Sequence, residues 1–263
     1  MIDMNQIVGT HDLALIVLDA LRYDVAIEEL AAGNTPNLAA LIGSWEKRHS
    51  PGTFTYASHT AFFAGFLPTP ARPGRHPRTF ALAFEGSETT GPSTCVLDGA
   101  ASVPEGLAAR GYHTLCVGGV GFFNLENPLG NALPSLFAER HWDRSTGVTD
   151  PESFVNQIAI VERSLAALPA EQLAFTFVNV AAIHQPNHFY LESGPERDTL
   201  ASHAAALRHV DSHLPRLMSA LRRRPTFAII TSDHGTLYGE DGFVGHRVAH
   251  PLVTTVPYAE VTS

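Results

Sequence analysis

Two apolar runs followed by acidic residues constrain the fold of this chain most strongly. Residues 13–18 read LALIVL and precede Asp19, and residues 227–230 read FAII and precede the segment Thr231 to Gly235, which contains Asp233 and His234. Uninterrupted apolar runs of this kind are typical of parallel strands covered on both faces. Because open α/β sheets bind ligands beyond the carboxyl ends of their strands, these acidic residues and His234 are candidates for a metal or catalytic site. The alternative is an ordinary turn in which Asp233 makes an Asx-type hydrogen bond and Gly235 lets the backbone turn sharply.

Helical and strand-like patterns alternate along the rest of the chain. We therefore expect a single α/β domain over residues 1–263, with a mainly parallel central sheet and helices on both faces. On the long helix expected at 196–222, we interpret His203, His209 and His213 as solvent-facing. Further strands are expected at 79–84, 112–117, 173–180 and 226–232, and further helices from about 22 to 33 and at 35–42, 61–66 and 151–168.

Composition excludes several classes of protein. The formal net charge of −9 argues against nucleic acid as the main partner, because nucleic-acid-binding proteins usually carry a basic excess. No apolar run approaches the roughly 18 residues needed to span a bilayer, and the N-terminal residues do not resemble a signal peptide. We therefore expect no membrane association and a cytoplasmic location. Cys95 and Cys116 are too few for a disulfide framework and show no metal-binding spacing, so both are interpreted as structural.

Histidines in two loops add potential metal ligands. His184 and His188 follow the strand expected at 173–180, where Pro186 favours a loop over a helix, and His246 lies in a later loop. Together with Asp19 and the Asp233–His234 pair, these side chains are enough for two metal ions. The mixture of nitrogen and carboxylate ligands favours zinc, manganese or a related ion over calcium.

A hydroxyl-rich stretch over residues 50–60 leads into the helix expected at 61–66. A hydroxyl at this position would lie in the positive field of the helix N-terminus, which stabilises an oxyanion or a bound anion. The alternative is that Thr55 or Ser58 is merely the N-cap. The Pro/Arg-rich loop at 69–78 is either a basic edge for an anionic substrate or simply solvated, and Gly118 to Gly121 is interpreted as a turn after a strand.

These segments resemble the alkaline phosphatase and sulfatase superfamily. The resemblance rests on the apolar run that ends in Asp19-Ala-Leu-Arg-Tyr-Asp, on Thr-Pro-Asn-Leu, on the segment from Thr55 to Pro68, on the His184 loop and on Thr-Ser-Asp233-His234-Gly. It implies an alkaline phosphatase-like fold with Thr55 as the nucleophile. It also implies one ion held by Asp19, Asp233, His234 and Thr55, and a second held by His184, His188 and His246.

Other positions match the superfamily less well. His59 falls where sulfatases have an arginine, which suggests that it orients the nucleophile or the anion, and Ser58 falls at a phosphate-contacting position. Arg22 and Arg247 are candidate charge partners for a phosphoryl group, or else structural ion-pair members. His250 is a reserve ligand should His246 point away.

Three departures separate the chain from true sulfatases. Their tandem Asp-Asp is Asp19-Ala20 here, their later Asp-Asn is Asp233-His234, and their Cys/Ser-x-Pro-Ser-Arg motif is absent. The resemblance therefore implies a two-metal hydrolase of phosphomonoesters or phosphodiesters that acts on an anionic small molecule, with zinc as the favoured ion. One alternative is sulfate or phosphonate hydrolysis at the same site. Another is a non-catalytic, metal-stabilised partner of a biosynthetic enzyme.

Overall fold

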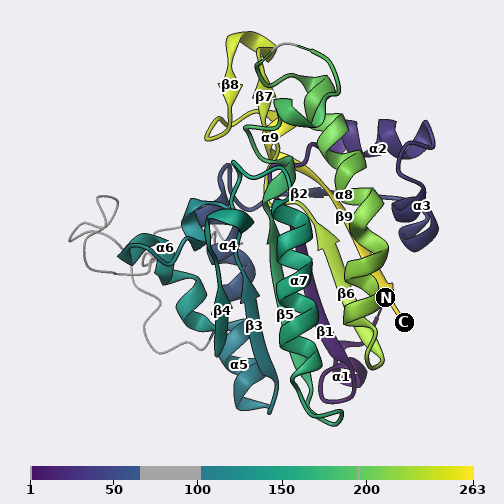
Figure 1. Ribbon diagram of the computed structural model, residues 1–263, viewed down its shortest axis with the longest axis vertical. Coiled ribbons are helices and arrows are strands. Elements are labelled where there is room, and N and C mark those ends of the chain that lie inside the picture. The colour runs from purple at the N-terminus through teal and green to yellow at the C-terminus, as the bar shows by residue number, and fades with distance from the viewer. Residues whose placement is uncertain (1, 66–101, 195) are drawn as a thin grey trace, which may run out of the picture.

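A seven-stranded sheet forms the centre of the computed structural model, which describes residues 2–65, 102–194 and 196–263 (Figure 1). The strand order is β2-β9-β6-β1-β5-β3-β4. Five strands are linked by parallel pairing: β1 (Asp12–Leu18), β3 (His113–Val117), β4 (Glu139–His141), β5 (Ala174–Val180) and β6 (Thr226–Thr231). The strand β9 (Thr255–Thr262) runs antiparallel to both β6 and β2 (Glu46–His49). The predicted mainly parallel α/β sheet is thus confirmed. The antiparallel strands β2 and β9 at one edge of the sheet were not predicted.

The two apolar runs are neighbours in the middle of this sheet. β1 pairs with β6 on one side and with β5 on the other, so that Val17 lies opposite both Thr231 and Asn179. Every residue of β5 is buried, as expected for a strand covered on both faces. This pairing brings the carboxyl ends of β1, β5 and β6 to one edge of the sheet. The expected strand at 79–84, the loop at 69–78 and Cys95 lie outside the described residues.

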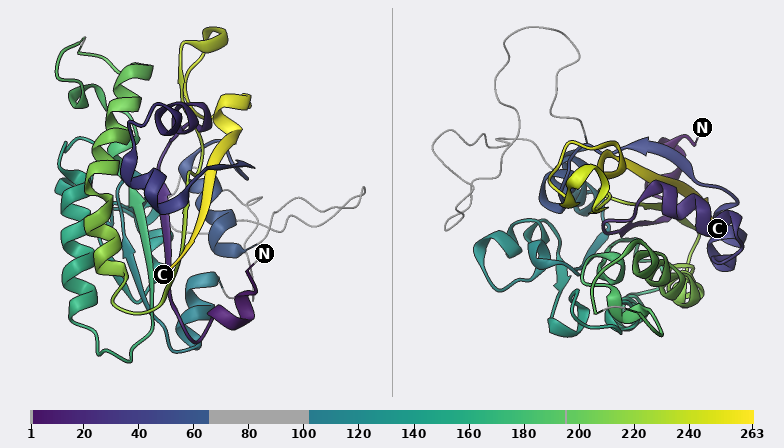
Figure 2. Two further views of the ribbon diagram at one scale, coloured as in Figure 1. Left: turned by 90° about the vertical axis from the view of Figure 1, so that its right-hand side faces the viewer. Right: turned by 90° about the horizontal axis from the view of Figure 1, so that it is seen from above.

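Helices cover both faces of the sheet, as Figure 2 shows, and enclose two apolar clusters. Beside one cluster lie α2 (Tyr23–Ala31), α3 (Pro36–Ile42), α7 (Ser153–Ala166) and α8 (Leu200–Leu221). The other face carries α1 (Met4–Ile7), α4 (Thr55–Ala64), α5 (Val103–Ala109) and α6 (Pro128–Ala132). Near the carboxyl edge are α9 (Pro251–Thr254) and a hairpin of β7 (Leu237–Tyr238) and β8 (Val244–Gly245). No helix among the described residues has the length and apolar character needed to cross a membrane.

The remaining helical segments are single 3-10 turns. They span Gly121–Phe123, Pro134–Leu136, Arg144–Thr146, Ala181–Ile183, His188–Tyr190 and Glu240–Gly242. The 3-10 turn at Ala181–Ile183 directly follows β5 and delivers His184 to the carboxyl edge of the sheet.

Helix α4 begins earlier than the sequence pattern suggested. The prediction started this helix at Ala61, but its first residue is Thr55, and Phe54 occupies the N-cap position with an extended backbone. The N-cap residue is therefore Phe54, and not Thr55 or Ser58. The side chain of Phe54 makes no capping hydrogen bond. The hydroxyl of Thr55 therefore belongs to the first helical residue, where the helix field is most positive.

Candidate metal centre and active site

Asp19, Asp233 and His234 meet at the carboxyl ends of the adjacent strands β1 and β6. All three side chains are fully buried. Nε2 of His234 lies 3.4 Å from Oδ2 of Asp233 and 3.8 Å from Oδ1 of Asp19. Within the described parts of the chain, this is the one group of three or more His, Cys, Asp or Glu side chains whose ligand atoms lie within 4.8 Å of one another.

The donor atoms of this group fit a divalent metal ion. Oδ1 of Asp19 and Oδ2 of Asp233 are buried and have no hydrogen-bond partner among residues 2–65, 102–194 and 196–263. Leaving buried carboxylate oxygens unpaired is costly unless a cation or a proton is present. Accordingly, burial raises the pKa of Asp19 to about 6 and that of Asp233 to about 7. An ion bound between the unpaired oxygens would remove this cost.

Hydrogen bonds hold the other atoms of the group in place. The backbone N–H groups of Ala20 and His234 donate to Oδ1 of Asp233 at 3.1 and 3.0 Å. Nδ1 of His234 lies 2.9 Å from the carbonyl oxygen of Gly235, which can only accept, so Nδ1 carries the proton. The lone pair of this imidazole is therefore on Nε2, the atom that faces both carboxylates.

Thr55 places its hydroxyl at the same point. Its Oγ1 lies 3.2 Å from Nε2 of His234 and 3.4 Å from Oδ2 of Asp19, and the residue is 1% exposed. The position at the start of the ten-residue helix α4 adds the positive end of the helix dipole. The structure thus combines a hydroxyl, a cation-binding corner and an anion-stabilising helix end.

Two of the three loop histidines approach this centre, and the third does not. The ring centroid of His246 lies 4.5 Å from that of His234 and 5.4 Å from that of His184. Nδ1 of His184 donates to the carbonyl of Gln185 at 2.6 Å, which leaves its Nε2 available as a ligand. His188 is one-third exposed instead, and its Nδ1 lies 3.4 Å from Oδ1 of Asp198.

The two arginines differ in their surroundings. Arg22 is 3% exposed and forms ion pairs with Asp24 and Glu240. Its charge is therefore paired with these two carboxylates, which favours the structural ion pair over the phosphoryl contact, the two alternatives that the sequence left open. Arg247 is exposed, its backbone N–H donates to the carbonyl of Thr53 at 2.7 Å, and no carboxylate pairs with its side chain among the described residues.

Ser58 and His59 position the start of α4 beside the cluster of Asp19, Asp233 and His234. Oγ of Ser58 donates to the carbonyl oxygen of Asp233 at 2.8 Å, and Nδ1 of His59 donates to the carbonyl oxygen of Thr55 at 2.8 Å. The imidazole of His59 packs among four phenylalanine rings. Burial lowers the pKa of His59 to about 3, so its imidazole stays neutral. These contacts favour the alternative in which His59 orients the nucleophile, and they give Ser58 a positioning role through Asp233. The surrounding rings belong to Phe62, Phe63, Phe123 and Phe177.

His250 has a structural role as well. Its Nδ1 accepts a hydrogen bond from the backbone N–H of Leu252 at 3.1 Å, which caps α9, and its Nε2 lies 3.1 Å from Oδ2 of Asp241. Both ring nitrogens are thus occupied. His246, rather than His250, is the histidine of this loop whose ring lies beside His234.

Gly235 is required for close packing rather than for a left-handed turn. A Cβ atom at this position would lie 2.0 Å from the carbonyl oxygen of Leu252. A side chain here would push α9 away from the loop that carries Asp233 and His234.

Sequence reasoning missed two buried polar residues near the site. His203, expected to face solvent, is fully buried: its Nε2 accepts from the N–H of Arg22 at 3.3 Å, and its Nδ1 donates to the hydroxyl of Tyr238 at 3.0 Å. Asn179 on β5 donates to Oδ2 of Asp19 at 2.8 Å. The only hint in the sequence was an amide inside an otherwise apolar strand, whereas the burial of His203 depends on tertiary packing.

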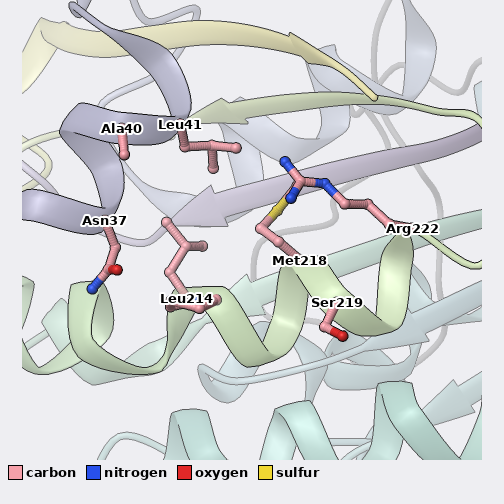
Figure 3. A pocket seen from close by; sticks show the side chains of 8 residues that line it. Asn37, Ala40, Leu41, Leu214, Met218, Ser219 and Arg222 are labelled. Atoms are coloured by element: carbon pink, nitrogen blue, oxygen red, sulfur yellow. The ribbon is translucent and has the colours of Figure 1, made fainter.

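A separate groove of about 480 Å³ lies between α3 and α8 (Figure 3). Its lining is mainly apolar and includes none of the residues of the metal centre. The lining residues are Asn37, Ala40, Leu41, Leu214, Pro215, Met218, Ser219 and Arg222.

The fold and the site define an alkaline phosphatase-like α/β protein with a buried cation-binding corner beside a helix N-terminus. The family model described as Sulfatase matches residues 11–252, so the chain belongs to the sulfatase family. This confirms the resemblance to the alkaline phosphatase and sulfatase superfamily. Members of this superfamily are metal-dependent and act on phosphate and sulfate esters.

Solved structures of low sequence identity share the fold. The C-terminal periplasmic domain of phosphoethanolamine transferase EptC from Campylobacter jejuni has a TM-score of 0.63 at 15% identity, covering 97% of this chain and 80% of that chain. The corresponding domain from Escherichia coli, in complex with Zn, has a TM-score of 0.64 at 12% identity, with coverages of 97% and 73%. A putative sulfatase from Bacteroides thetaiotaomicron has a TM-score of 0.63 at 14% identity, with coverages of 97% and 65%. No curated protein matches the sequence.

Proposed function

We propose that this protein is a metal-dependent hydrolase of phosphoesters with Thr55 as its nucleophile. The observation that carries the proposal is the position of the Thr55 hydroxyl, which lies between the carboxylate of Asp19 and Nε2 of His234. Structural neighbours described as phosphoethanolamine transferases support chemistry at a phosphoester.

The residues of the site would have different roles in the reaction. Asp19, Asp233 and His234 would hold a divalent ion, and their nitrogen and carboxylate ligands suit zinc or manganese. Such an ion supplies positive charge that lowers the pKa of a neighbouring hydroxyl and offsets the charge on a transferred phosphoryl group. The oxygen of Thr55 attacks phosphorus while the bond to the leaving alcohol breaks. Water then attacks the phosphorylated threonine and restores the hydroxyl, which releases phosphate when the substrate is a monoester and a phosphomonoester when it is a diester.

A second ion is part of the proposal. His184 and His246 would provide two of its ligands, because their rings lie 5.4 Å apart and the ring of His246 lies 4.5 Å from that of His234. His188 is the least supported of the three expected ligands because it is paired with Asp198. The guanidinium of Arg247, which pairs with no carboxylate among the described residues, would attract an anionic small-molecule substrate to this side of the site. The absence of membrane and nucleic-acid partners and the cytoplasmic location stay predictions.

The nucleophile can be tested with a pair of threonine variants. Thr55→Ala should lose turnover while it keeps its bound metal, because the hydroxyl is removed and the three buried ligands remain. Thr60→Ala is the matched control, since Thr60 lies in the same helix but its hydroxyl donates to the carbonyl of Tyr56 at 2.5 Å. Mass spectrometry of the acid-quenched wild type should show phosphate on Thr55. Full turnover by Thr55→Ala would exclude this nucleophile.

The substrate class needs a separate panel. After chelation and reloading with zinc or manganese, p-nitrophenyl phosphate, bis-p-nitrophenyl phosphate, a phosphonate ester and p-nitrophenyl sulfate distinguish the hydrolase classes. We expect turnover of a phosphate ester. Turnover of only the sulfate or the phosphonate would favour those activities, and no turnover in any metal form would favour a non-catalytic partner.

Phosphoryl transfer to an alcohol is a second candidate function. It is favoured by the neighbours described as phosphoethanolamine transferases, and it would use the same phosphothreonine. Adding glycerol or ethanolamine as an acceptor separates the two reactions. With a phosphomonoester substrate, a hydrolase releases one phosphate for each leaving group, whereas a transferase releases less phosphate and forms the phosphorylated acceptor.

A further inference from the structure

We propose that Asn179 is a positioning residue that orients Asp19 so that only the Oδ1 atom of this carboxylate binds the metal ion. This inference rests on the proposed function, because it assumes that Asp19 is a metal ligand. It adds a residue of β5 that does not itself touch the ion, and it assigns a role to Gly119 in the Gly-rich segment of residues 118–121.

The contact between the two side chains selects one carboxylate oxygen. Asn179 and Asp19 are both fully buried, and Nδ2 of Asn179 donates to Oδ2 of Asp19 at 2.8 Å. Oδ1 of Asp19 has no hydrogen-bond partner among the described residues and faces Nε2 of His234 at 3.8 Å. The amide therefore occupies one oxygen and leaves the other for the cation.

The orientation of the Asn179 amide is set by the backbone. The N–H of Val120 donates to Oδ1 of Asn179 at 3.0 Å. A backbone N–H can only donate, so the amide oxygen must face Val120 and the amide NH₂ must face Asp19. A flipped amide would place an oxygen against the carboxylate and leave the N–H of Val120 without an acceptor.

Glycine at position 119 permits this arrangement. A Cβ atom on Gly119 would lie 2.3 Å from the carbonyl oxygen of Asn179 and 3.0 Å from its Oδ1. Gln157 closes the other side, because its Nε2 donates to the carbonyls of Gly118 and Asn179 at 2.9 and 2.6 Å. The segment is therefore a close-packing site that holds Asn179 in place, and not merely a turn.

Donors of this kind affect metal affinity through the ligand that they orient. Loss of such a hydrogen-bond partner typically costs about 10-fold to 100-fold in metal affinity or activity. Without the amide, only the longer contact with the Thr55 hydroxyl at 3.4 Å would restrain Oδ2 of Asp19, so that both oxygens could turn toward the ion and change the coordination number as well as the affinity.

The experiment uses full-length variants that are first checked for cooperative unfolding. Asn179→Leu keeps the side-chain size and removes the donor. Gly119→Ala displaces Asn179 without changing its chemistry, so it preserves the test if Asn179→Leu does not fold. Gly121→Ala is the matched control, because a Cβ atom there would meet nothing within 4 Å.

Two measurements besides activity decide the outcome. Competition titration of zinc against a chromogenic chelator should show about 10-fold to 100-fold weaker binding for Asn179→Leu and Gly119→Ala and no change for Gly121→Ala. The visible absorption of the cobalt-loaded protein should weaken in Asn179→Leu as the coordination number rises. Wild-type zinc affinity and an unchanged cobalt spectrum in the folded variants would overturn this inference alone, whereas a wild type without zinc uptake would overturn the proposed metal function with it.

Discussion

The hydroxyl oxygen of Thr55 lies 3.2 Å from Nε2 of His234, although 179 positions separate the two residues in the sequence. The start of α4 is braced against the loop after β6 by the hydrogen bond from Ser58 to the carbonyl of Asp233. His59 adds a hydrogen bond to the carbonyl of Thr55 from among the four phenylalanine rings. The Thr55 hydroxyl and the cluster of Asp19, Asp233 and His234 are thus parts of one buried assembly. The position of the hydroxyl and the position of the cluster depend on each other.

Burial of the two carboxyls gives the metal-free protein a contribution to stability that becomes less favourable as the pH rises. The pKa of Asp19 is raised to about 6 and that of Asp233 to about 7, from an ordinary value of 3.8. Between pH 3.8 and 7 these two carboxyls therefore bind more protons in the folded state than in the unfolded state, and each reduces stability by up to about 1.4 kcal/mol per pH unit. Buried His59, whose pKa is lowered to about 3, acts with the opposite sign up to its ordinary value of 6.5, so the carboxyl contribution is isolated by comparing a carboxyl variant with the wild type. Asp233→Asn should stabilise the metal-free protein, most at neutral pH and above, and should abolish stabilisation by zinc. Urea unfolding in a chelator over pH 5 to 8 measures both effects, and a less stable Asp233→Asn protein at pH 8 would contradict the assignment.

The parts of this assembly differ in how far the sequence reveals them. Apolar runs bounded by acidic residues are local features, so β1, β6 and the convergence of Asp19 with His234 could be predicted. Strand β2 could not, because all four of its residues are exposed and carry no apolar pattern. The burial of His203 and the pairing of Arg22 with Glu240 depend on contacts between distant segments. The proximity of Asn179 to Asp19 follows from the strand order, which sequence periodicity does not specify.

Arg22 offers a test of structural against substrate-binding roles. Arg22→Ala should destabilise the protein by about 1–3 kcal/mol, because Asp24 and Glu240 would lose their cation while remaining partly buried. KM should change little, since the guanidinium is committed to these carboxylates. The control is Arg216→Ala, which breaks an exposed ion pair with Glu162 and should cost less than about 1 kcal/mol. Denaturant unfolding measures the change in stability, and steady-state kinetics measure the change in KM. A large rise in KM at unchanged stability would show that Arg22 binds the substrate.

Gly235 offers a test of close packing beside the metal ligands. In Gly235→Ala the new methyl group would clash with the carbonyl of Leu252, so either α9 or the loop that carries His234 must move. We expect a stability loss of about 1–3 kcal/mol, the usual range for overpacking, together with weaker zinc binding. Gly239→Ala is a useful contrast because its strain is conformational: φ is +130° and the space around it is open. It should destabilise the hairpin but leave zinc affinity unchanged, and equal zinc affinities in all three proteins would show that the packing of Gly235 does not position the ligands.

The loop histidines separate the one-ion and two-ion forms of the proposal. The ring of His246 lies 4.5 Å from that of His234, whereas His188 is held by Asp198 at 3.4 Å. His246→Ala should therefore lower activity about 10-fold or more, and His188→Ala should lower it by less than about threefold, because only His246 faces the centre. Metal analysis of both variants after exhaustive dialysis identifies the ion that each residue holds. Two ions in the wild type and one in His246→Ala would support the second site. A full complement in His246→Ala, with an ion lost from His188→Ala instead, would show that the His188 loop moves to bind metal and that His246 acts only as a neighbour of His234.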